Sequence, residues 1–152
     1  MMKTIKKMAA IVMVSAMVFS IAACKKGSKA VSADDFKKAC EEVSLTVSDE
    51  GAVDGLKKSL NAKNDDDSID VAYMVADSED DAKEGFKYFT DNTDSMKEMG
   101  ADIKSSDNKL EVSMSNLMYI YAVRSGDTII TISAAGEDQI STSKDLIKKL
   151  GI

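Results

Sequence analysis

The first 23 residues limit what the rest of the chain can fold into, because they have the composition of an export signal. Residues 1–7 contain three lysines and no acidic residue, and an uncharged, mostly apolar run follows over residues 8–23. A basic start, a short apolar segment and small residues at its end are typical of a secretory signal peptide, which is removed from the mature protein. The sequence therefore predicts a cleaved leader over residues 1–23, a tether over residues 24–31 and one domain over residues 32–152.

The apolar run ends in Ile21-Ala22-Ala23-Cys24, which resembles the lipobox of bacterial lipoproteins. The resemblance implies that the leader is cut before Cys24, that the Cys24 thiol carries diacylglycerol, and that the protein is anchored to the lipid bilayer on the extracytoplasmic face of the cell membrane. It covers about a sixth of the chain and implies nothing about residues 30–152. Two other interpretations stay open: a retained transmembrane anchor, although the run is shorter than the ~20 residues that span a bilayer, and a buried core helix, although the run lacks a polar face.

The net charge of the mature chain limits the classes of molecule that it can bind. Without the leader, 17 basic and 26 acidic residues remain, so the net charge is −9. Without the tether lysines Lys25, Lys26 and Lys29 as well, the domain has a net charge of −12. A domain of this charge is repelled by nucleic acid and by anionic lipid headgroups. The three tether lysines, in contrast, could favour anionic lipids by roughly 1 kcal/mol each, or serve only as a solvated spacer.

The residue types that are missing remove several kinds of chemistry. The chain has no histidine, so the usual transition-metal sites and most general-base arrangements are excluded. If Cys24 carries lipid, Cys40 is the one remaining cysteine, which excludes an intramolecular disulfide. Cys40 lies on the apolar stripe of a predicted helix and is expected to be a small buried hydrophobe rather than a nucleophile. We expect no enzymatic activity and no cofactor.

Hydrophobic periodicity predicts an α+β domain. Capping boxes begin at Ser32 and at Ser78, where a serine precedes a helical apolar stripe and an acidic residue follows three positions later. Helices are expected over residues 33–43, 49–60, 79–99 and 137–150, and strands over residues 45–47, 69–76, 109–115, 117–124 and 128–134. Because hairpin-linked strands pair antiparallel, the expected fold is a two-layer sandwich with an antiparallel, mainly meander sheet and helices on one face.

Two clusters are candidate sites. Asp65, Asp66 and Asp67 could supply oxygen ligands to calcium, although they lack the spacing of a helix–loop–helix calcium site and are also typical of a solvated loop. Tyr119 and Tyr121 share one face of a predicted strand; if exposed, they would form a patch that contacts a partner, an envelope protein or surface component, and if covered, they belong to the core. The expected function is a non-enzymatic binding or accessory module, the alternatives being a weak calcium-binding module or a small enzyme without a recognisable motif.

Overall fold

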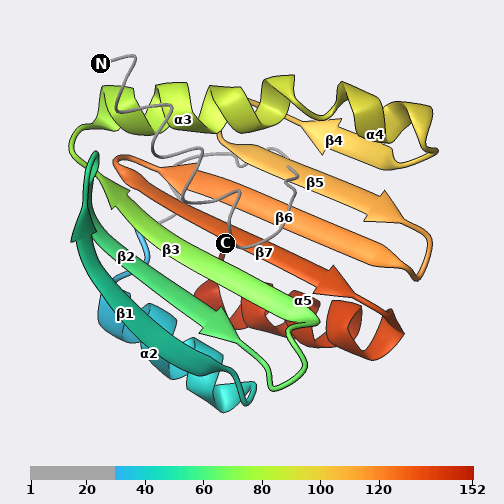
Figure 1. Ribbon diagram of the computed structural model, residues 1–152, viewed down its shortest axis with the longest axis horizontal. Coiled ribbons are helices and arrows are strands. Elements are labelled where there is room, and N and C mark those ends of the chain that lie inside the picture. Colours follow the sequence, from blue (N-terminus) through green and yellow to red (C-terminus); the bar gives the residue numbers. More distant parts are fainter. Residues whose placement is uncertain (1–29) are drawn as a thin grey trace.

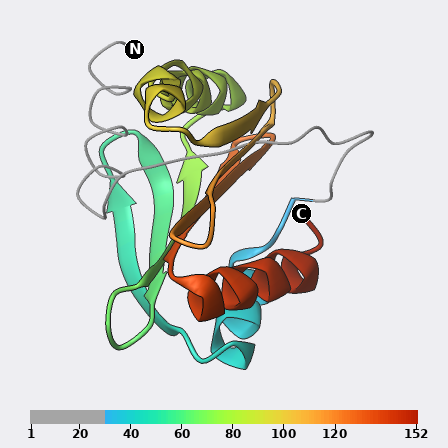
Figure 2. The same cartoon turned by 90° about the vertical axis from the view of Figure 1, so that its right-hand side faces the viewer.

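A computed structural model describes residues 30–152, which form one seven-stranded antiparallel sheet between two layers of helices (Figures 1 and 2). The sheet order is β1-β2-β3-β7-β6-β5-β4. In chain order the elements are α2 (Ala33–Glu42), β1 (Thr46–Val53), β2 (Leu56–Lys63), β3 (Ile69–Ala76), α3 (Glu79–Asp91), α4 (Asp94–Glu98), β4 (Asp102–Ser105), β5 (Lys109–Met114), β6 (Met118–Ser125), β7 (Thr128–Ala135) and α5 (Glu137–Leu150). The predicted α+β class and the antiparallel, mainly meander sheet are confirmed.

Two meanders meet at the centre of the sheet. One runs β1-β2-β3 and the other runs β4-β5-β6-β7, and the last strand of each pairs antiparallel with the other, from Ile69 opposite Ala134 to Val75 opposite Thr128. The connection through α3 and α4 carries the chain from the central strand β3 to the far edge at β4 (Figure 1). β3 and β7 lie at the centre of the sheet and are buried on both faces. Their sequences are therefore nearly continuous apolar runs.

The helices cover both faces of the sheet, so the expectation that they lie on one face is wrong. Val71 and Tyr73 of β3 belong to a core shared with α2 and α5, whereas Ala72 and Met74 belong to a second core under α3. Successive strand residues point to opposite faces, and both faces of β3 are apolar, so each face needs its own helical cover. Figure 2 shows the sheet between α3 with α4 on one side and α2 with α5 on the other.

The helix expected over residues 49–60 is also wrong, because this segment forms the β1–β2 hairpin. Asp54-Gly55 makes the turn, with Gly55 at φ +89°, a conformation that glycine adopts without steric cost. The pairing register shifts on both sides of Gly51 in β1 and again between Leu56 and Lys58 in β2. These β-bulges disturb the two-residue alternation of apolar side chains that is typical of a strand. As a result, the sequence spacing of Val53, Leu56 and Leu60 resembles the apolar stripe of a helix.

The helix starts follow the capping signals. The Ser32 hydroxyl accepts the Asp35 amide hydrogen at 3.1 Å, and the Ser78 hydroxyl accepts the Asp81 amide hydrogen at the same distance. The helix expected to continue to residue 99 instead ends at Asp91, and the short helix α4 follows it. Gly151 at φ +70° ends α5 as expected.

The two edge strands, β1 and β4, each offer little regular backbone for pairing with another strand. β1 is irregular and β4 is short. β1 has eight residues, and the Asp49 carboxylate accepts the Gly51 amide hydrogen at 3.0 Å within the bulged region. β4, which the periodicity did not predict, has only four residues, and three of them are exposed. Both edges therefore depart from a long, flat strand.

Candidate functional site

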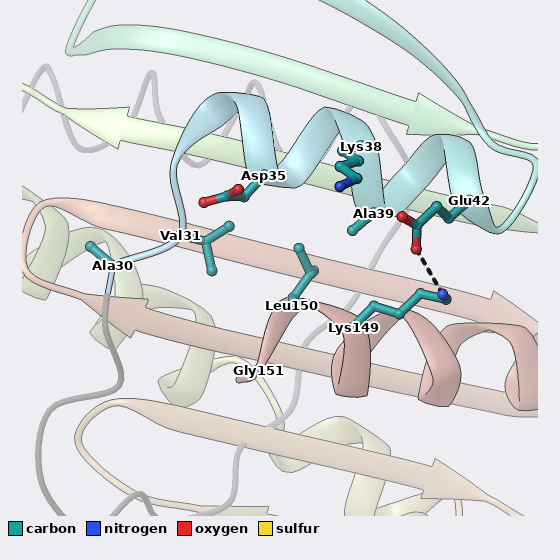
Figure 3. Close-up of a pocket in the computed structure, with 9 residues that line it drawn as sticks. All are labelled: Ala30, Val31, Asp35, Lys38, Ala39, Glu42, Lys149, Leu150 and Gly151. Atoms are coloured by element: carbon teal, nitrogen blue, oxygen red, sulfur yellow. Dashed lines mark hydrogen bonds and ion pairs between the residues drawn. The ribbon is translucent and has the colours of Figure 1, made fainter.

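The chain enters the domain beside α2 and α5. Ala30 is exposed, whereas Val31 is buried, and its carbonyl oxygen accepts a hydrogen bond from the Tyr73 hydroxyl at 2.9 Å. Cys24, the predicted lipidation site, and the leader lie outside the described residues. The structure nevertheless fixes where the chain that follows Cys24 joins the folded domain, which is at one end of the groove drawn in Figure 3.

This groove, called the α2–α5 groove below, has a volume of about 430 Å³. It is lined by Ala30, Val31, Asp35, Lys38, Ala39, Glu42, Lys149, Leu150 and Gly151. Lys149 donates a hydrogen bond to Glu42 at 2.8 Å, and this bond together with the lysine charge lowers the pKa of the Glu42 carboxyl. With two carboxylates, two lysines and an apolar floor, the α2–α5 groove is balanced in charge (Figure 3).

A second groove, the α3 groove, lies on the opposite face of the sheet and has a volume of about 610 Å³. Its walls come from α3, from the turn between β4 and β5, and from β6. The lining residues are Lys83, Phe86, Lys87, Thr90, Asp91, Ser105, Ser106, Asp107, Asn108 and Arg124. The buried Phe86 ring contributes an apolar surface, and most of the other side chains offer hydrogen-bond donors or acceptors.

Arg124 holds the base of the α3 groove. Its side chain is only 8% exposed, and its guanidinium donates to the Gly126 carbonyl oxygen at 3.0 Å and to the Asn108 side-chain oxygen. The Arg124 amide nitrogen also donates to the Asn108 carbonyl oxygen at 2.8 Å. Glu79, at the start of α3, lies 3.7 Å from the same guanidinium. One side chain thus ties the β4–β5 turn, the β6–β7 turn and α3 together.

The polar side chains that line the α3 groove are mostly paired with neighbouring groups. Its exposed lysines lie beside carboxylates, with Lys87 and Asp91 at 2.5 Å and Lys83 and Glu79 at 3.3 Å. The Ser106 hydroxyl donates to the Lys109 carbonyl oxygen at 3.3 Å, and the chain supplies no histidine to activate a hydroxyl nucleophile. Paired charges, hydroxyls and amides around a shallow apolar floor can hold a polar molecule through several hydrogen bonds.

Tyr119 and Tyr121 do not form an exposed patch, so the partner-contact site predicted there is wrong. They are 4% and 3% exposed and belong to the core under α5. The Lys144 ammonium lies 5.2 Å from the centre of the Tyr119 ring, and the Tyr119 hydroxyl donates to Glu111 at 3.1 Å. Burial, followed by the Glu111 charge, raises the pKa of the Tyr119 hydroxyl. The alternation was correct, but the face it marks is covered by a helix.

The acidic run Asp65, Asp66 and Asp67 forms the turn between β2 and β3. The Asp66 carboxylate accepts the Ser68 amide hydrogen at 3.1 Å and the Ser68 hydroxyl at 2.5 Å, and these bonds lower the pKa of that carboxyl. Lys63 lies 3.4 Å from Asp67. Among residues 30–152, no three Asp, Glu, Cys or His side chains are gathered as metal ligands. The structure therefore gives calcium binding at these residues no support.

Cys40 lies on the buried side of α2, as its position on the apolar stripe predicted. Burial, and to a smaller extent the charge of Glu41, raises the pKa of its thiol to about 12. Since the thiolate is the reactive form, this cysteine is unreactive at neutral pH in the folded protein.

The α3 groove was missed in the sequence because its parts are far apart in the chain and one of them, β4, was not predicted. The available signals were a polar run over residues 105–108 at a hairpin turn and a single arginine, Arg124, in an otherwise apolar strand. Neither signal places the turn beside α3, which depends on the crossover of the chain from β3 to β4.

Within residues 30–152, no helix has both the length and the apolar content needed to cross a bilayer. No protein-family model and no curated protein matches the sequence. Among solved structures, the chain is similar to a GTP binding regulator from Thermotoga maritima, with a TM-score of 0.46 and 14% identity over 82% of this chain and 90% of that one. It is also similar to the extracellular domain of PknH from Mycobacterium tuberculosis, with a TM-score of 0.38 and 11% identity over 96% of this chain and 90% of that one. Both TM-scores are below 0.5, and neither similarity says what this chain does.

Proposed function

We propose that this protein is a bacterial lipoprotein, anchored through Cys24 on the extracytoplasmic face of the cell membrane, whose domain is a binding or accessory module rather than an enzyme. The observation that carries the proposal is the lysine-flanked apolar leader that ends in Ile21-Ala22-Ala23-Cys24. Two acyl chains at ~0.8 kcal/mol per buried methylene make a stable anchor, whereas a single chain is marginal. Anchoring concentrates a small domain at a surface, so even modest affinity for an envelope component is useful.

The chemistry of the domain supports binding over catalysis. The one cysteine of the described residues is buried and protonated, and the chain has no histidine. The α3 groove provides hydrogen-bonding groups from three elements around an apolar floor. We assign ligand or partner binding to the α3 groove, in place of the buried tyrosines.

Intact-mass spectrometry tests the anchor. Protein extracted from membranes should lack residues 1–23 and carry the added mass of acyl groups, whereas a Cys24→Ser variant should keep its leader and carry no lipid. The reason is that the lipobox resemblance makes Cys24 both the residue that carries the lipid and the residue before which the leader is cut. Full-length, unmodified wild-type protein would contradict the proposal.

Binding at the α3 groove can be tested by thermal unfolding in the presence of a panel of sugars, amino acids and short peptides. A compound that binds the native state stabilises it by about 2.7 kcal/mol at 100 times its dissociation constant. We expect such a compound to raise the Tm of wild type more than that of Lys87→Ala/Ser105→Ala, which removes two polar groups from the groove walls. Lys38→Ala, on the other face, is the matched control and should respond like wild type. An equal rise in all three proteins would place the ligand elsewhere.

A further inference from the structure

The two helical layers of the domain are not equivalent with respect to the tether. The first described residues and the C-terminus lie on the side of α2 and α5, and α3 with α4 lies across the sheet from them (Figure 2). Ala30 and Val31 line the α2–α5 groove, so this groove is at the point where the chain leaves the domain (Figure 3). We propose that the face formed by α2 and α5 lies against the lipid headgroups and that the α3 groove opens away from the membrane. This inference rests on the proposed anchor at Cys24.

The length of the tether supports this orientation. Six residue steps separate Cys24 from Ala30, and at ~3.3–3.6 Å per residue they reach at most about 20 Å. A helix with its side chains is about 10–12 Å across, so two helical layers with a sheet between them are roughly 30 Å thick. To turn α3 toward the membrane, the tether would have to pass around the whole thickness of the domain, which exceeds its reach.

Charge favours the same orientation. α3 and α4 together contain seven acidic residues and three lysines, whereas α2 and α5 contain seven acidic residues and five lysines. The net charge is therefore −4 for α3 with α4 and −2 for α2 with α5. Anionic headgroups repel the acidic α3–α4 layer, and they attract basic residues that lie within about a Debye length, ~8–10 Å, of the surface. Both helical layers are acidic, but α2 with α5 is the less acidic layer and is repelled less by anionic headgroups.

The residues that line the α2–α5 groove are of types that can contact lipid headgroups. Its apolar floor, from Val31 and Leu150, is bordered by Lys38 and by the Lys149–Glu42 pair (Figure 3). Lysine stems can cover apolar surface while their ammonium groups reach polar phosphates. The α3 groove, which has a more polar lining, lies on the opposite face of the sheet.

The orientation can be measured on the processed lipoprotein in vesicles of phosphatidylcholine and phosphatidylglycerol that contain a headgroup-linked nitroxide quencher. Single cysteines labelled with a fluorophore are introduced at two exposed lysines, Lys38→Cys beside the α2–α5 groove and Lys87→Cys beside the α3 groove. Labelling is selective, because Cys24 is consumed by lipid and Cys40 is buried. Both variants lose one lysine, so they are matched in charge. We expect several-fold stronger quenching at position 38 than at position 87.

A second pair, Lys148→Cys on α5 and Lys83→Cys on α3, repeats the comparison in case one variant is poorly folded. Equal quenching at the two faces, or stronger quenching on α3, would overturn the orientation while leaving the anchor intact. Flotation of the same vesicles reports the anchor independently. Protein that does not float with the vesicles would overturn the proposed anchor, and the orientation with it.

Discussion

Replacing Phe36 by alanine should lower the free energy of unfolding by about 3–5 kcal/mol, the usual cost of removing a buried aromatic side chain. Phe36 is fully buried in α2, and its ring centre lies 5.1 Å from that of Tyr73. The substitution removes the contact that fixes α2 to the centre of the sheet, and it leaves a cavity that the surrounding strands can fill only in part. Denaturant unfolding followed by circular dichroism measures the change.

Tyr88→Ala is the matched control for this prediction, because Tyr88 lies on α3 and is 37% exposed. Its loss should change the free energy of unfolding by much less than the loss of Phe36. Similar effects of the two substitutions would show that α2 does not pack on the sheet as described.

Replacing Arg124 by alanine should lower the free energy of unfolding by about 3–6 kcal/mol, because it removes two hydrogen bonds of a charged group, which contribute ~1.5–3 kcal/mol each. The variant loses the bonds to the Gly126 carbonyl and to the Asn108 side chain, and both turns lose their common support. The ion pair with Glu79 should contribute little to this cost, since Glu79 is largely exposed. Thermal and denaturant unfolding give the size of the loss.

Arg124→Lys separates geometry from charge. Lysine keeps the positive charge but lacks the planar fork that reaches two acceptors in different directions, so it should recover only part of the lost stability. Lys87→Ala, in the same groove but exposed, should be nearly neutral. A lysine variant as stable as wild type would mean that charge alone is sufficient at this position.

Local signals in the sequence predicted the elements whose structure depends on local interactions. The serine caps of α2 and α3 depend on a hydroxyl and an amide three residues apart, and they appear at Ser32 and Ser78 as expected. β3 was predicted with its full length, because its apolar run is bounded by an acidic loop on one side and a cap on the other. The C-terminal glycine of α5 was equally clear.

Features that depend on distant segments could not be predicted in this way. The bulges at Gly51 and near Lys58 arise where β1, β2 and β3 adjust to one another, and they disturbed the periodicity on which the strand prediction depended. Alternation placed Tyr119 and Tyr121 on one face of β6, but that α5 folds back over this face after β7 depends on contacts between distant segments. The α3 groove was missed because the crossover from β3 to β4 brings residues 105–108 beside α3.

The irregular edges of the sheet affect whether neighbouring copies of the protein can pair through their strands. Molecules held on one membrane surface meet frequently, and an open strand edge is a template for pairing with a neighbour. Here the eight residues of β1 are broken by bulges around Gly51, and β4 at the other edge offers only four residues, among them Asp102 and Lys104. If the protein is anchored as proposed, these bulged and short edges would hinder sheet-to-sheet pairing between copies on one membrane surface.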